Sequence, residues 1–137
     1  MPDTLEGLEQ HRQQLYEQLS AVGDFRPGMI SVNYRKCGKA NCACARAGHP
    51  GHGPQYLWNT TQQGKSQAQN LRLGPELEKA ERELASYQRF LALCRELVVV
   101  NSRICQLRPL GEGPGGSELE QLKKKLHKKY NKKRSKR

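Results

Sequence analysis

Three cysteines and two histidines fall within sixteen residues of a stretch with almost no apolar content. Cys37, Cys42 and Cys44 are followed by His49 and His52. Four glycines and two prolines lie between residues 38 and 54, so the stretch is typical of an irregular loop. Such a loop cannot hold its shape by burying side chains, whereas a metal ion bound to thiolates and imidazoles can fix it.

The residue types in this loop match those that bind structural zinc, which takes four thiolate or imidazole ligands in a tetrahedron. Cys37, Cys42 and Cys44 supply three ligands, and His52 or His49 supplies the fourth. We favour His52, because the glycines on both sides of it let the backbone bend. The Cys-x4-Cys-x-Cys-x7-His spacing differs from the paired CxxC motifs of a zinc ribbon. Because one loop supplies all four ligands, we expect a closed structural site and no catalytic zinc.

Other roles for the cysteines are buried packing without metal, a reactive thiol and an iron–sulfur cluster. Packing suits Cys94 and Cys105, which lie in a helical pattern, but not the loop cysteines. Nearby cations can lower the pKa of Cys37, yet no acidic residue lies between Asp24 and Glu76 to orient a histidine. With no paired carboxylates, phosphate loop or triad in the sequence, we expect a protein that is not an enzyme.

The 137-residue length predicts one domain with a modest core. No apolar stretch is long enough to span a membrane, and the N-terminal residues lack the basic and apolar regions of a secretory signal. We therefore expect a cytoplasmic, reducing environment, in which clustered cysteines bind metal and do not form disulfides.

The hydrophobic pattern predicts an α+β fold. An apolar stripe predicts a helix over residues 4–22, and alternation from Ile30 to Tyr34 predicts a strand. Residues 55–61 and 66–73 form the arms of a hairpin around a turn at 62–65. We expect a small zinc-stabilised, three-stranded antiparallel sheet with the metal loop between its first two strands, flanked by the N-terminal helix and a long C-terminal helix in a coiled-coil-like hairpin.

A long helix is predicted over residues 75–108, with proline at its first position and acidic residues in its first turn. Its apolar residues follow a heptad-like step, interrupted by Asn101, and further apolar residues widen the stripe. Because the first helix is too short to cover it all, the sheet or a second chain must cover the rest, and we expect a homodimer. The stripe comprises Leu77, Ala80, Leu84, Tyr87, Leu91, Cys94, Val98 and Cys105, widened by Phe90, Leu93, Leu97 and Ile104.

These elements divide the chain into five segments. An N-terminal helix occupies 1–24, the zinc loop and hairpin occupy 25–74, and the long helix occupies 75–108. A flexible Gly/Pro linker at 109–116 precedes a basic tail at 117–137, which we expect to be disordered or helical.

The positive charge is confined to two segments. Residues 25–75 contain seven Lys/Arg and residues 121–137 contain ten, and neither segment contains an acidic residue. Such asymmetry indicates a polyanionic partner. The candidate phosphate-contacting residues are Arg35, Lys36, Lys39, Arg46, Lys65, Arg72, Lys123, Lys124, Lys125, Lys128, Lys129, Lys132, Lys133, Arg134, Lys136 and Arg137. Tyr34, Tyr56 and Trp58 can stack on unpaired bases, although the latter two share one strand face and fit a sheet core better.

The run from Tyr34 to Cys44, followed by His52-Gly-Pro-Gln-Tyr-Leu57, resembles a small bacterial family defined only as a domain of unknown function. Its members carry a CGKxxCxC…HGPxY signature and are loosely associated with mobile genetic elements. The resemblance covers about residues 26–108. It places Cys37, Cys42, Cys44 and His52 in the signature and leaves His49 outside it.

These features predict a zinc-stabilised nucleic-acid-binding accessory protein. Its basic loop and tail would contact phosphates, within a mobile-element nuclease, transposase or RNA–protein complex. The alternative is an adaptor that docks a larger nucleic-acid enzyme through the long helix and zinc module. The sequence leaves RNA and DNA equally open as partners.

Overall fold

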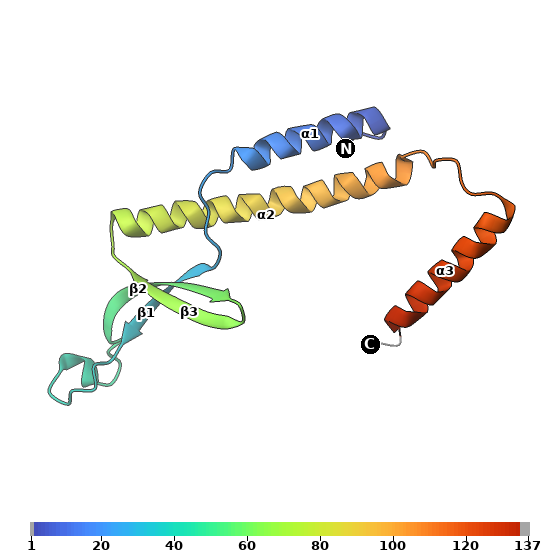
Figure 1. The fold of residues 1–137 in the computed structure, drawn as a ribbon. Helices are drawn as coiled ribbons and strands as arrows, with labels where there is room; N and C mark the ends of the chain where they lie inside the picture. Colours follow the sequence, from blue (N-terminus) through green and yellow to red (C-terminus); the bar gives the residue numbers. More distant parts are fainter. Residues whose placement is uncertain (1, 135–137) are drawn as a thin grey trace. The chain divides into compact units, whose positions relative to one another are not determined.

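A computed structural model describes residues 2–134 of the chain, with side chains described as far as residue 132. It shows an α+β fold of three helices and an open three-stranded antiparallel sheet, as the sequence predicted (Figure 1). Two compact units, Met1–Gln106 and Leu107–Arg137, make up the chain. The elements are α1 (Leu5–Ser20), β1 (Met29–Arg35), a short 3-10 helix (Ala43–Ala45), β2 (His52–Gln62), β3 (Lys65–Leu71), α2 (Pro75–Leu107) and α3 (Gly116–Arg134).

The sheet has the strand order β1-β2-β3, and both neighbouring pairs are antiparallel. One expectation needs correction, because β2 begins at His52 and not at residue 55. His52 pairs with Arg35 beyond an irregularity in the β1–β2 register. The glycines and prolines around His52 suggested a loop, but pairing with β1 extends the strand. The fourth expected ligand therefore lies on a strand and not within the irregular loop.

Helix α1 begins at a capped terminus, where Thr4 Oγ1 accepts a hydrogen bond of 3.1 Å from the backbone N–H of Gly7. It lies alongside α2 (Figure 1), and two side-chain hydrogen bonds join these helices. Leu8 and Leu15 of α1 are 0% and 1% exposed. Their burial against α2 holds the helix pair together, since the polar face of α1 remains in solvent.

The apolar surface of α2 is divided between two partners. Its first turns pack on the sheet, where Leu77 and Ala80 form a core with Leu71. Farther along, Leu93, Val100 and Ile104 are buried. These three residues lie within about 40° of one another on a helix of 100° per residue, so they form the face toward α1. This face is centred more than about 100° around the helix from the heptad-like stripe, so most of the later part of that stripe stays outside the α1–α2 contact.

An ionic and aromatic contact fastens the sheet to α2. The guanidinium of Arg26, just before β1, donates a 2.6 Å hydrogen bond to Glu83 of α2 and lies 4.6 Å from the centre of the Trp58 ring. The Trp58 Nε1–H donates to the carbonyl of Pro27 at 2.6 Å. Lys79 and then Arg26 lower the pKa of Glu83. Trp58 is thus held inside the sheet–helix junction.

Helix α3 lies in the second unit, and its side chains are exposed throughout the part described, up to residue 132. Of the two states expected for the basic tail, the structure shows the helical one from Gly116 to Arg134. Apolar side chains at Leu119, Leu122, Leu126 and Tyr130 are between 38% and 55% exposed. Among the described residues, no helix combines the length and apolar character that crossing a membrane requires.

Candidate metal centre

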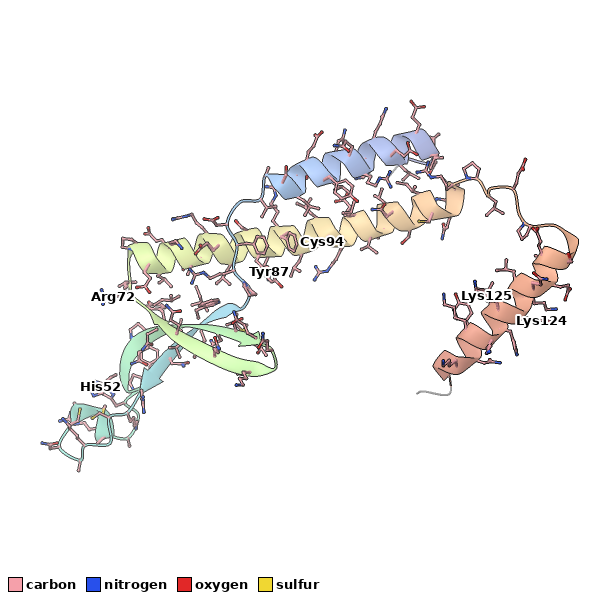
Figure 2. The ribbon with its side chains drawn as sticks, viewed as in Figure 1. His52, Arg72, Tyr87, Cys94, Lys124 and Lys125 are labelled. Atoms are coloured by element: carbon pink, nitrogen blue, oxygen red, sulfur yellow. The ribbon has the colours of Figure 1, made fainter. Side chains whose placement is uncertain are left out.

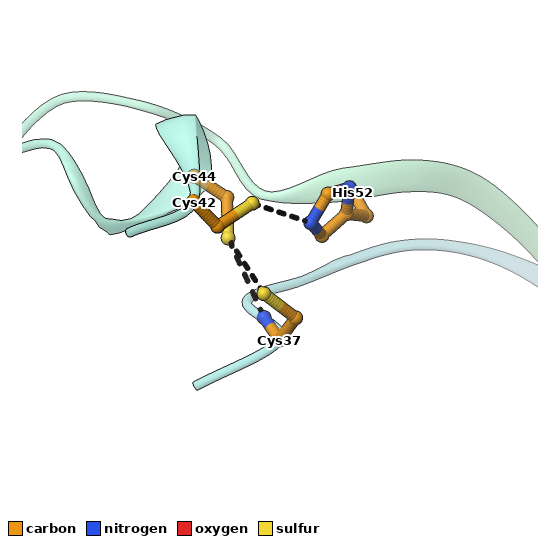
Figure 3. A group of neighbouring side chains, drawn as sticks. All are labelled: Cys37, Cys42, Cys44 and His52. Carbon is orange, nitrogen blue, oxygen red and sulfur yellow. Dashed lines mark hydrogen bonds between the residues drawn. The ribbon is translucent and has the colours of Figure 1, made fainter. Parts of the chain in front are cut away.

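The four predicted ligands come together at one end of the sheet. The Sγ atoms of Cys37, Cys42 and Cys44 and a ring nitrogen of His52 all lie within 4.8 Å of one another (Figure 3). The Sγ atoms of Cys37 and Cys44 are 3.5 Å apart, and Cys42 Sγ is 3.2 Å from His52 Nε2. The backbone N–H of Cys37 also donates to Cys44 Sγ at 3.5 Å.

Two of these separations are close to those around a tetrahedral ion. Zinc–sulfur bonds of about 2.3 Å and zinc–nitrogen bonds of about 2.0 Å place neighbouring ligand atoms about 3.5–3.8 Å apart. The sulfur–sulfur separation of 3.5 Å and the sulfur–nitrogen separation of 3.2 Å are each about 0.3 Å below the value for their pair of atoms. Three thiols and one imidazole are a donor set that favours zinc over hard cations such as Mg²⁺ and Ca²⁺. The cluster is therefore compatible with a closed four-ligand metal site.

Different local structures position the four ligands. Cys37 follows the end of β1, Cys42 precedes the short 3-10 helix, and Cys44 lies inside that helix. His52 opens β2. Cys44 is only 1% exposed, while Cys37 and His52 are at the surface. A bound ion would thus join the two strand ends to the loop between them.

Two glycines allow β2 to approach β1 at this point. Gly51 has φ +104°, and a Cβ there would lie 2.8 Å from the backbone carbon of Arg35. Gly53 has φ +141°, and its Cβ would lie 2.8 Å from the carbonyl oxygen of Asn33. Any larger residue would push the strands apart. These glycines therefore do more than permit a bend, because they set the distance between His52 and the cysteines.

The second histidine of the motif has a different role. His49 Nδ1 accepts a hydrogen bond of 2.9 Å from the backbone N–H of Gly51, so its ring supports the turn that leads into β2. His49 is not in the group of four potential ligands. The structure thus brings together the ligand set that includes His52.

The pKa shifts within the cluster determine which ligands a cation would have to deprotonate. A hydrogen bond from the backbone of Lys39, followed by one from His52, lowers the pKa of the Cys37 thiol to about 6. Hydrogen bonds with Cys37 and then Cys42 raise the pKa of His52. The backbone N–H of Cys37 favours the Cys44 thiolate, but burial and the neighbouring sulfurs outweigh it and raise the pKa of Cys44. A metal ion must therefore displace protons from Cys44 and His52, so we expect its binding to weaken as pH falls.

Substituting Gly51 by alanine tests the strand approach. We expect Gly51→Ala to weaken zinc binding at least about tenfold, because overlap with Arg35 displaces His52 and because φ is positive. Competition with a chromophoric zinc chelator measures the change. Gly48→Ala is the matched control, since Gly48 has φ +85° but no atom within 4 Å of the position that an alanine Cβ would take. Equal losses in the two variants would contradict the role of close approach.

The predicted cationic residues are exposed wherever their side chains are described. Arg35, Lys36, Lys39 and Arg46 lie in the same stretch of chain as the three cluster cysteines. A hollow of about 380 Å³ on the loop is lined partly by Asn41 and Arg46. Lys65 begins β3, and Arg72 lies between β3 and α2 (Figure 2). In α3 the exposed cations are Lys123, Lys124, Lys125, Lys128, Lys129 and Lys132, while the side chains of Lys133, Arg134, Lys136 and Arg137 lie outside the described residues.

The three aromatic candidates separate into two groups. Tyr56 and Trp58 are partly buried against the core formed by the sheet and α2, as their shared strand face indicated. Tyr34 remains 51% exposed, one residue before Arg35. Only Tyr34 among these three is therefore available to stack on a base beside the metal cluster.

Comparison with protein families gives a match over residues 5–82 to a family described as Domain of unknown function (DUF6788). The chain belongs to this family. The family region includes α1, the whole sheet, all four cluster residues and the first turns of α2. The matched region, 5–82, begins and ends earlier than residues 26–108, over which the sequence resembles a domain of unknown function. No curated protein and no solved structure matched the chain.

Proposed function

We propose that this DUF6788-family protein is a zinc-stabilised, non-enzymatic nucleic-acid-binding accessory protein. Cys37, Cys42, Cys44 and His52 would hold Zn²⁺, which links the ends of β1 and β2 through the loop. The ion supplies rigidity, because the loop has little apolar material to bury. A rigid loop presents its cations to a phosphate backbone with less loss of conformational entropy than a mobile one.

One observation carries the proposal. The segment that contains the metal cluster has seven basic residues and no acidic residue, and its four loop cations are exposed. Three thiolates and one Zn²⁺ would together add only one negative charge, so the segment stays strongly positive. Exposed cations without nearby acids are what a phosphate polymer recognises. Tyr34, half exposed at the edge of this patch, offers a surface for stacking an unpaired base.

Neutralising the loop cations tests this proposal. We expect a triple variant, with Lys36, Lys39 and Arg46 all changed to glutamine, to bind labelled RNA and DNA more weakly, both single-stranded and double-stranded. The slope of log affinity against log salt should fall by about two to three, because each lost phosphate contact removes about 0.7–0.9 from it. Fluorescence anisotropy over a salt series measures both quantities.

The matched control removes three cations from α2. Arg82, Arg89 and Arg95 are also exposed, but they alternate with acidic residues along the helix. Their replacement by glutamine should leave the salt slope unchanged. If both triple variants lose affinity equally, the binding is non-specific attraction to net charge and the loop has no special role.

The resemblance to a family associated with mobile elements supports a place in a mobile-element nuclease, transposase or RNA–protein complex. The second candidate is an adaptor that docks a larger nucleic-acid enzyme through α2 and the zinc module. Exposed Val98 and Val99 on α2 favour that alternative. Affinity of residues 1–110 for an oligonucleotide at physiological salt supports the first function. Affinity of that fragment only for a protein partner supports the second.

A further inference from the structure

One face of the sheet points away from α2, and its side chains are mostly polar. The other face packs on α2 (Figure 1), where Ile30, Tyr56 and Trp58 join the core. Side chains alternate along a strand and paired residues share a face, so the register assigns the remaining positions to the opposite side. We call this side the open sheet face. It consists of the odd-numbered residues of 29–33 and 55–61 and the even-numbered residues of 66–70.

Amide and hydroxyl groups dominate the open sheet face, and none of its residues is charged. Near its centre, Nδ2 of Asn59 donates a hydrogen bond of 2.7 Å to Oγ of Ser31, which fixes the orientation of this amide. Such groups donate and accept hydrogen bonds without carrying charge, so they can recognise a pattern of donors and acceptors. The exposed polar side chains of the face are Asn33, Gln55, Thr61, Ser66 and Asn70.

Cations lie at both ends of the open sheet face. Arg35 ends β1 and Arg72 follows β3 at the end that carries the metal cluster, whereas Lys65 begins β3 at the opposite end. All three side chains are exposed, and the strand from Lys65 to Leu71 is about 20 Å long. An uncharged polar surface between cations fits a ligand with phosphates on both sides of hydrogen-bonding groups. A groove of a nucleic-acid duplex has this arrangement.

The positions of the aromatic residues disfavour a single strand as the ligand of this face. Sites for single strands stack successive bases on aromatic rings. The three strands contain three aromatic residues, and two of them, Tyr56 and Trp58, lie on the α2 side. Tyr34 is half exposed near the metal loop, where one ring can stack on only one base. The open sheet face itself contains no aromatic ring.

Of the two kinds of duplex, DNA offers the groove that fits. The major groove of B-DNA is about 12 Å wide and admits β-strands, whereas that of A-form RNA is too narrow for side chains to reach the bases. In the DNA groove, Asn and Gln pair with adenine through two hydrogen bonds, and apolar side chains contact the thymine methyl group. Met29 and Ala68 are exposed on this face, where they help to line a hollow of about 580 Å³. Amides beside small apolar groups thus match A·T pairs.

We propose that the open sheet face recognises A·T base pairs in the major groove of double-stranded DNA. Gln55 and Asn70 contact base edges, while Arg35, Lys65 and Arg72 contact phosphates at the two ends of the face. This recognition rests on the proposed function and narrows its ligand to one polymer. The cations of the metal loop and α3 then supply affinity, and the sheet supplies sequence preference.

Selection from a randomised pool of duplex DNA tests the base preference of the full-length, zinc-loaded protein. We expect the recovered sites to share a run of A·T pairs. By fluorescence anisotropy at one salt concentration, the selected duplex should bind at least about tenfold more tightly than one in which G·C pairs replace this run. Single-stranded DNA and duplex RNA of the selected sequence should bind no more tightly than the G·C duplex.

Two pairs of exposed amides give a matched comparison within the sheet. Gln55→Ala with Asn70→Ala removes two amides from the open sheet face, and Gln67→Ala with Gln69→Ala removes two from the α2 side of β3. The first variant should lose at least about tenfold affinity for the selected duplex, because two base contacts are gone. Its affinity for the G·C duplex and its salt slope should not change. The second variant should lose less than about threefold.

The possible failures are distinguishable. Binding of duplex DNA without base preference, or equal losses in the two double variants, would overturn recognition by the open sheet face and leave the proposed function intact. Tighter binding of single-stranded DNA or duplex RNA would do the same. Failure to bind any nucleic acid would refute the proposed function itself, and base recognition with it.

Discussion

Cys44→Ser should sharply lower the zinc affinity of the protein while leaving the helices folded. If the roughly 10–16 kcal/mol of a structural zinc site is shared among four ligands, losing one removes about 3 kcal/mol, which weakens binding more than a hundredfold. Cys44 is the buried member of the cluster, and its sulfur contacts both the sulfur and the backbone N–H of Cys37. Mass spectrometry under native conditions and metal analysis give the zinc content.

The matched control is Cys105→Ser, which removes an exposed thiol on α2 and should leave the zinc content unchanged. Amide exchange should show lost protection in residues 35–55 of Cys44→Ser, with α1 and α2 still protected, because Leu8, Leu15 and Val100 form their contact without the loop. Wild-type protein that contains no zinc and keeps its loop structure in strong chelator would contradict the metal centre.

Neutralising the described lysines of α3 should cause the second large effect. We expect a variant with six lysines changed to glutamine to bind nucleic acid more weakly, whatever the base sequence. The six are Lys123, Lys124, Lys125, Lys128, Lys129 and Lys132. The salt slope should decrease by about four to five, so the wild type would lose about a thousandfold more affinity than the variant between 50 and 200 mM salt. All six side chains are exposed on a helix without acidic neighbours after Glu120.

The control for this experiment changes the same six lysines to arginine, which keeps the charge. That variant should retain the wild-type salt slope, and circular dichroism should show whether either variant changes the helix content. An unchanged slope in the glutamine variant would remove the tail from the binding surface. Binding that remains, with the loop cations intact, would then be assigned to the metal-loop patch.

The amino-acid order alone determined most of the secondary structure. Regular patterns that repeat locally, such as the stripe of α1 and the alternation from Ile30 to Tyr34, report a helix or a strand directly. The four cluster residues could also be found in this way, because so many metal-binding side chains in a loop without apolar content have few other roles. The residue types and spacing of these four ligands can be read from a short stretch of sequence without knowledge of the fold.

The tertiary structure decided how those elements use their surfaces. His52 became the first residue of β2 because pairing with Arg35 favours extended backbone beside two glycines, and no local pattern encodes a partner strand. In the same way, α1 packs on Leu93 and Ile104 and leaves the heptad-like stripe largely uncovered. A helical pattern shows which side chains are apolar. Which of these apolar side chains is buried depends on the length and position of the neighbouring helices and strands. Those neighbours come from distant parts of the chain.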